Sequence, residues 1–200
     1  MKAHIISWQK YLGVIFFMLI SGCTISHDYG PFKGRVLDLE TGGPIEGAVV
    51  FLRFYTQFQL SPGGPVAKYA DAIEVVTDHN GEFSIPTHKV EAFRLLHGWE
   101  PECTVKIFKP GYGVFPHHKN AKPKFKPTYS IPEDQYNVVW LPKLKTKEER
   151  KENLYDVGGY SRGDVPMEKQ RIYFDMYNAE REFLGLSPLP IITKKLKIKR

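Results

Sequence analysis

Cysteine is scarce in this sequence: Cys23 and Cys103 are the only two among its 200 residues. Cys23 could be a core residue, half of a disulfide, a catalytic thiol or an attachment point for another group. Cys103 falls in the run CTVKIF, which alternates as a β-strand does, and free cysteine is among the most buried residue types. We therefore expect Cys103 to be a buried, unreactive thiol.

Long apolar runs are also missing. The best candidate is YLGVIFFMLISG, residues 11–22, an uncharged segment of 12 residues that follows Lys10. A membrane-spanning helix needs about 20 apolar residues, so this segment is too short to cross a bilayer. Positive charge at Lys2 and Lys10, followed by a short apolar core, is typical of a secretory signal peptide, which would comprise residues 1–22.

The end of this segment, Ile20-Ser21-Gly22-Cys23, resembles the bacterial lipobox. The resemblance implies that Ile20, Ser21 and Gly22 are recognised by the signal peptidase and removed, and that Cys23 becomes lipidated. Two or three acyl chains make a firm anchor, because each buried CH₂ contributes about 0.8 kcal/mol. The alternatives are an ordinary signal peptide with a chance cysteine and an uncleaved membrane anchor.

Motifs for catalysis and cofactor binding are scarce as well. The sequence has no glycine-rich phosphate loop that follows a strand and opens a helix. Gly-Tyr-Ser-Arg-Gly at 159–163 matches Gly-x-Ser-x-Gly, but we expect this stretch to be a loop that separates two helices. His117 and His118 point in different directions on an extended chain, and no His-x-His or His-x-x-x-His spacing supports a metal site. We expect no cofactor, no metal and no catalytic residue. A pocket that combines His88, His97 or His117 with a basic residue would favour a rival hypothesis, a hydrolase or ligand carrier, and scattered, exposed histidines would count against it.

The formal net charge of +6 is concentrated at one end of the chain. Five positive residues lie among the last seven, Lys194 to Arg200, so the rest of the chain is nearly neutral. No aromatic stacking pattern accompanies this basic tail, residues 191–200, and a short terminal run of charge is usually solvated. We therefore expect no binding to nucleic acid.

Residues 32–142, which follow a short polar tether at residues 23–31, have the pattern of β structure. Short β-branched and aromatic runs alternate with turns that contain Gly and Pro, and Asn80-Gly81 predicts a β-hairpin. The Pro-rich segment 113–134 predicts a loop that either covers a sheet edge or contacts sugar rings or an anionic partner. The pattern favours a mainly β fold, a β-sandwich of about seven strands.

Residues 143–190 predict a helical extension. Thr146 and Glu149 form a capping box, which predicts a first helix from Lys147 to about Asp156. Asp164 is the expected cap of a second helix. An apolar stripe predicts the buried face of that second helix, at Ile172, Met176, Ala179, Phe183 and Leu186.

Three segments, in order, carry a resemblance to a known family: GRVLDLETGGPIEGAVVFL, TDHNGEFSIP and VKIFKPGY. They resemble the carboxypeptidase regulatory-like domain, which implies a transthyretin-like, or prealbumin-like, β-sandwich over residues 32–142. Such domains are accessory or surface modules and are not catalytic. The enzymes of the transthyretin-like group have a C-terminal Tyr-Arg-Gly-Ser signature, whereas GYSRGD at 159–164 has these residue types in another order and outside the β part.

The sequence as a whole favours a non-catalytic lipoprotein that is anchored through Cys23 and acts as a binding or structural module of the bacterial cell envelope. Thr24 and Ile25 follow the cysteine without an aspartate, which resembles lipoproteins sorted to the outer membrane, facing the periplasm. A partner would be an envelope protein or a glycan that the sequence does not name. The alternative is a periplasmic transthyretin-like hydrolase or small-ligand carrier.

Overall fold

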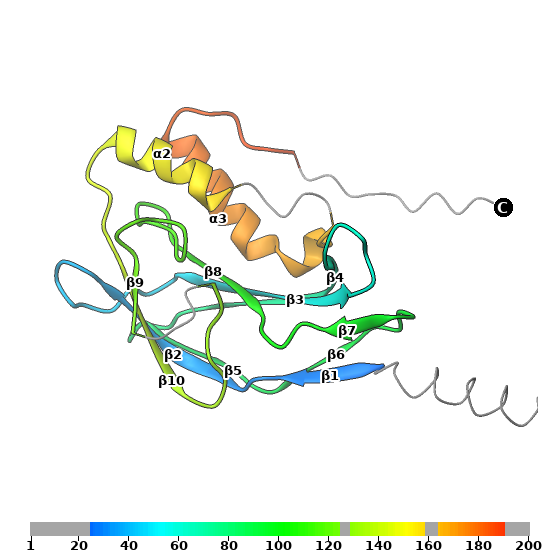
Figure 1. The fold of residues 1–200 in the computed structure, drawn as a ribbon. Helices are drawn as coiled ribbons and strands as arrows, with labels where there is room; N and C mark the ends of the chain where they lie inside the picture. Colours follow the sequence, from blue (N-terminus) through cyan, green and yellow to red (C-terminus); the bar gives the residue numbers. More distant parts are fainter. Residues whose placement is uncertain (1–24, 125–128, 159–163, 191–200) are drawn as a thin grey trace, which may run out of the picture.

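A computed structural model describes residues 25–124, 129–158 and 164–190. The lipobox at Ile20 to Cys23, the basic tail at 191–200 and all but the last residue of GYSRGD lie outside the described residues. Within the described residues the chain is mainly β, as expected, with ten strands in three small sheets and two helices after them (Figure 1). None of the described helices is long and apolar enough to span a membrane.

The elements follow one another from the blue to the red end of the chain in Figure 1. In chain order they are β1 (Ser26–Tyr29), β2 (Phe32–Asp38), β3 (Val49–Phe58), β4 (Val66–Val76), β5 (Glu82–Ile85), β6 (His88–Glu91), β7 (His97–Trp99), β8 (Thr104–Phe108), β9 (Lys122–Pro123), β10 (Tyr136–Leu141), α2 (Lys147–Val157), the 3₁₀ turn η1 (Met167–Lys169) and α3 (Arg171–Phe183).

One four-stranded sheet has the order β5-β2-β10-β9. Its central pair, β2 and β10, is parallel, with Lys33 beside Tyr136. The two strands approach so closely that a Cβ on Gly34 would collide with the backbone oxygen of Asn137, so this position requires glycine. A separate two-stranded sheet pairs β1 with β6, which places Ser26 opposite Glu91.

The other four-stranded sheet is built around β3, which pairs with β4 on one side and with β8 and β7 on the other. Both faces of β3 are covered. Val50 and Leu52 face the core between the sheets, whereas Val49 and Phe51 face a second core under the helices. This explains why β3 begins with the continuous apolar run VVFL instead of an alternating one.

Helices α2 and α3 form a third layer on the β3 sheet (Figure 1). The capping box predicted at the start of α2 is confirmed: the Thr146 hydroxyl accepts from the Glu149 N–H, and the Glu149 carboxylate accepts from the Thr146 N–H. The buried Asn153 side chain ties α2 to the segment after β8. Its oxygen accepts from the Val114 N–H at 2.9 Å, and its nitrogen donates to the Tyr112 oxygen at 3.1 Å.

The start of α3 differs from the prediction. Asp164 does not cap it; the helix begins at Arg171, after η1. The free N–H groups of its first turn are satisfied by the sheet below, since the Glu74 carboxylate on β4 accepts from Ile172 at 2.7 Å and from Tyr173 at 2.9 Å. A carboxylate at a helix N-terminus is stabilised by the unpaired donors and by the helix dipole. The cap was missed because it lies about a hundred positions away in the sequence.

The buried face of α3 was predicted in part. Of the expected stripe, Ile172, Met176 and Leu186 are partly buried and pack against the core under the helices, whereas Ala179 and Phe183 are exposed. The fully buried residues of the helix are Tyr173, Phe174, Tyr177 and Glu180. Polar atoms on this face have partners: the Tyr173 hydroxyl donates to the Val157 oxygen at 2.7 Å. Because buried polar groups are tolerated when they are hydrogen-bonded, the helix can present two tyrosines and a glutamate to the core.

Arg150 on α2 and Glu180 on α3 form a buried ion pair. Arg150 donates from Nε to Oε1 at 2.7 Å and from Nη2 to Oε2 at 2.5 Å. The Glu180 side chain is 0% exposed and that of Arg150 is 15% exposed. The N–H of Gly111, in the turn after β8, also donates to Glu180, at 3.0 Å. One carboxylate therefore joins both helices to the β part.

Other differences concern short strands and one turn. The structure has ten strands in its described residues, whereas about seven were expected. The additional short strands β1, β6, β7 and β9 form in segments for which the sequence predicted a tether, a loop or no definite structure. Asn80-Gly81 does form a tight turn, with the Gly81 N–H donating to the Asp78 oxygen at 2.8 Å. However, it joins β4 to β5 in a different sheet, so the predicted hairpin does not exist.

We predict that Glu180→Gln lowers the free energy of unfolding by about 3 kcal/mol, because it leaves the Arg150 charge buried without its partner. Urea denaturation measures the change. The matched control is Asp175→Asn, which breaks the exposed Arg171–Asp175 pair of the same helix and should cost less than about 0.5 kcal/mol. Equal small losses in both variants would show that the buried pair does not hold the helices.

Candidate functional site

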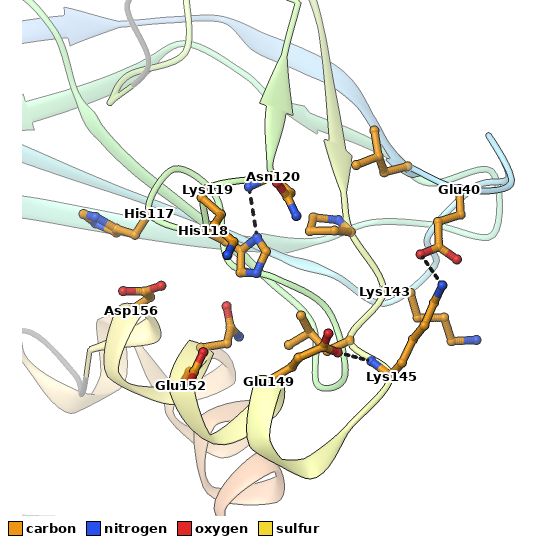
Figure 2. Close-up of a pocket in the computed structure, with 14 residues that line it drawn as sticks. Glu40, His117, His118, Lys119, Asn120, Lys143, Lys145, Glu149, Glu152 and Asp156 are labelled. Atoms are coloured by element: carbon orange, nitrogen blue, oxygen red, sulfur yellow. Dashed lines mark hydrogen bonds and ion pairs between the residues drawn. The ribbon is translucent and has the colours of Figure 1, made fainter.

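A pocket of about 440 Å³ lies between α2 and the loops at the end of the β part (Figure 2). We call it the charged pocket. Its walls come from four separate segments: residues 39–40 after β2, residues 117–120, residues 142–145 after β10, and α2 itself. Eleven of its 14 lining residues are charged residues, histidines or asparagines that the fold carries to the same place: Glu40, His117, His118, Lys119, Asn120, Lys143, Lys145, Glu149, Glu152, Asn153 and Asp156.

Three acidic residues of the pocket lie together on the wall formed by α2. Glu149, Glu152 and Asp156 are spaced three and four residues apart, which puts them on one face of α2. Figure 2 shows this acidic face opposite the loop that carries His117, His118 and Lys119. The charged pocket can therefore contact a small ligand that carries both a positive and a negative group.

The His118 ring has a defined hydrogen-bonding state. Its Nδ1 accepts a hydrogen bond from the Asn120 N–H at 3.2 Å, so the ring proton of the neutral form lies on Nε2. Burial lowers the pKa of His118, and burial together with the charge of Lys106 lowers that of His117. Both shifts favour the neutral rings, and the neutral His118 ring presents one N–H donor.

Some of the charged groups already have structural partners. Glu149 accepts from the N–H groups of Lys145 and Thr146, which lower its pKa, and Lys145 pairs with Glu40 at 3.1 Å. Glu152 and Asp156 have no ion-pair partner within the residues that the structure describes. These two carboxylates are the ones left to meet a ligand.

The lining of the charged pocket offers carboxylates, imidazoles and amines. The lining contains no serine, threonine or cysteine, so no hydroxyl or thiol nucleophile faces the pocket. Across the described ranges, no three His, Cys, Asp or Glu side chains gather closely enough to hold a metal ion.

The three histidines named from the sequence lie at three different places. His117 lines the charged pocket together with Lys119. His88 Nε2 is 2.9 Å from the Asp71 carboxylate, and His97 Nδ1 is 3.2 Å from the Thr56 hydroxyl, both away from the pocket. The structure therefore does not gather them into one site.

Cys103 is buried, as predicted, and burial raises the pKa of its thiol to about 12. The thiolate is therefore scarce at neutral pH, and the residue is unreactive. Sequence reasoning missed the acidic wall of the pocket. The available signal was the spacing of Glu149, Glu152 and Asp156 within a helix that the capping box had already located.

Comparison of the chain with models of protein families, with curated proteins and with solved structures finds no match. The resemblance of residues 32–142 to the carboxypeptidase regulatory-like domain is therefore argued below as a proposal.

We predict that long-range ¹H–¹⁵N spectra at pH 7 show His118 as the neutral form with its proton on Nε2. The reason is that the Asn120 N–H occupies Nδ1. The titration midpoint of this ring should lie below 6.5, in the direction that burial imposes. A proton on Nδ1, or a midpoint above 6.5, would contradict the hydrogen bond and the burial.

Lys106 on β8 lies beneath the C-terminal end of α2. Its Nζ donates to the Val157 oxygen at 2.5 Å, yet burial, reinforced by the charge of Arg53, lowers its pKa from 10.5 to about 8. Between pH 8 and pH 10.5 the Lys106 amine is protonated in the unfolded chain but neutral in the folded chain. Stability therefore rises as the pH increases from 8 toward 10.5.

We predict that Lys106→Met flattens this pH dependence. Urea unfolding at pH 7, 8, 9 and 9.5 should show the free energy of unfolding of the parent protein rising above pH 8, by up to about 1.4 kcal/mol per pH unit. The range stops below about pH 10, where tyrosines of the unfolded chain ionise. Parallel curves for the two proteins would show that Lys106 does not titrate in this window.

Proposed function

We propose that this chain is a bacterial envelope lipoprotein, held on the membrane by a lipid on Cys23, whose folded part is a non-catalytic binding or structural module. The observation that carries the proposal is the motif Ile20-Ser21-Gly22-Cys23 at the end of a 12-residue uncharged apolar segment. A double or triple acyl anchor on Cys23 gives stable attachment without a membrane-spanning helix. Thr24 and Ile25, without an aspartate, favour the outer membrane, with the protein facing the periplasm.

For the β part we propose a carboxypeptidase regulatory-like domain with a transthyretin-like β-sandwich. The ordered motifs support this, and so does the backbone at their glycines. Gly42, Gly47, Gly81 and Gly111 all have positive φ, the conformation in which glycine is favoured at turns. Two four-stranded sheets that share one core agree with such a sandwich. The helical layer would be an addition to it.

The charged pocket favours a second role, that of a small-ligand carrier. The observation is the acidic face of α2 opposite two histidines and Lys119. Such a pocket supports binding of a ligand with both signs of charge. His117 lies in this pocket together with Lys119, which favours the alternative of a hydrolase or carrier, whereas His88 and His97 lie elsewhere.

The anchor is tested by growing bacteria that express the protein with an alkyne analogue of palmitate. We expect the parent protein to be labelled and recovered with the membranes, and Cys23→Ala to lose the label, because no other exposed thiol replaces Cys23. Cys103→Ala is the matched control, since Cys103 is buried in the core, and it should be labelled as the parent is. Unchanged labelling of Cys23→Ala would overturn the proposal.

A further inference from the structure

Six large apolar side chains at one end of the molecule are exposed to solvent. We call this surface the apolar end, and it consists of Ile25, Leu60, Val66, Phe93, Leu95 and Leu96. Each of these residues is between 49% and 70% exposed. Single exposed apolar residues are ordinary on protein surfaces, whereas a group of large ones marks a surface that contacts something.

Backbone pairing places these residues together although they are far apart in the sequence. The Ala92 N–H donates to the Ile25 oxygen at 2.9 Å, which puts Ile25 beside the segment that begins at Phe93. Phe58, at the end of β3, pairs with Val66 on one side and with His97 on the other. Figure 1 shows β1, β7 and the β3–β4 connection at the same end of the two larger sheets.

The segment 92–96 is held firmly, so its exposed side chains do not result from a loose loop. Arg94, between the exposed Phe93 and Leu95, donates to the Thr56 hydroxyl at 2.6 Å and to the Tyr69 oxygen at 2.5 Å. Leu96 adopts a φ of 62°, which an ordinary side chain rarely takes and which costs free energy. The hydrogen bonds of Arg94 and the strained backbone at Leu96 therefore hold these apolar side chains in positions that face solvent.

The connection to Cys23 identifies the occupant of this surface. Ile25 lies two residues after Cys23, and two residues span at most about 7 Å of extended chain. A lipid on Cys23 would therefore hold Ile25, and the end of the molecule to which it belongs, close to the bilayer surface. The opposite end of the ten-residue strand β3 is about 30 Å farther away.

We propose that the apolar end is the membrane-facing surface of the protein and inserts its side chains into the interfacial region of the bilayer that holds Cys23. This inference rests on the lipid anchor proposed above. Apolar side chains with cations beside them suit that region, and the exposed Lys68 and the partly buried Arg94 lie at this end. Glu91, in contrast, pairs with Lys89 at 3.0 Å.

The test uses the full lipidated protein in vesicles of phosphatidylethanolamine and phosphatidylglycerol that contain nitroxide-labelled lipid. Leu95→Cys and Glu46→Cys are labelled with the same fluorophore; Cys103 is buried and does not compete. Glu46 is exposed and lies shortly before Val49, the first residue of β3, at the end of that strand opposite the apolar end. We expect the lipid to quench the label at position 95 about threefold or more above the label at 46, since quenching requires contact with the interface.

A second variant separates insertion from simple proximity. The label is placed at Leu60→Cys, and Phe93→Ser, Leu95→Ser and Leu96→Ser are combined in the same chain. All three side chains are exposed, so the fold should survive, as an unchanged circular dichroism spectrum would show. We expect quenching at position 60 to fall to the level of position 46. The reason is that each lost apolar group lowers the equilibrium constant for insertion into the bilayer by roughly tenfold or less.

The outcomes distinguish this inference from the anchor. Quenching at position 95 no greater than at position 46, in protein that carries the lipid on Cys23, overturns the membrane-facing surface and leaves the anchor intact. Protection of position 95 in detergent, with a dimer in solution, assigns the surface to a second copy and also overturns it. Absence of the lipid on Cys23 defeats the proposed function itself.

Discussion

A carboxylate that has no exposed surface must be paired, because the cost of burying an unpaired charge exceeds what most single contacts contribute. Glu180 meets this requirement with Arg150 and the N–H of Gly111, and so fixes α3, α2 and the turn after β8 relative to one another. The acidic wall of the charged pocket lies on the same helix as Arg150. The shape of the pocket therefore depends on an ion pair that does not line it.

The sequence predicted features whose cause is local. The capping box located α2 because both of its partners lie within four residues, and the alternating run around Cys103 placed that thiol in the core. The buried face of α3 could be predicted only in part in this way. Periodicity counts tyrosine and glutamate as surface residues, whereas Tyr173 and Glu180 find their partners in other elements. The turn at Asn80-Gly81 has the same local chemistry whether the next strand joins the same sheet or the facing one.

The candidate site was less predictable than the fold, because four segments that are distant in the sequence form the charged pocket. The lipobox is different, since a signal peptidase reads a linear motif that needs no folding.

The fold separates the apolar end from the charged pocket. The apolar end lies at the C-terminal end of β3. The charged pocket includes residues 39–40, which precede the N-terminal end of that strand. Under the proposals above, the pocket would open toward water on the side away from the membrane.

The parallel pairing of β2 with β10 also constrains the order in which the protein can assemble. Lys33 emerges early in synthesis, and its neighbour Tyr136 follows more than one hundred residues later. Until then one edge of β2 has no strand beside it, and closing so long a loop is slow. A chain that is exported through a membrane from its N-terminus would thus reach the far side with an incomplete sheet. Such a chain would benefit from a chaperone on that side, and it would remain unfolded enough to be threaded across.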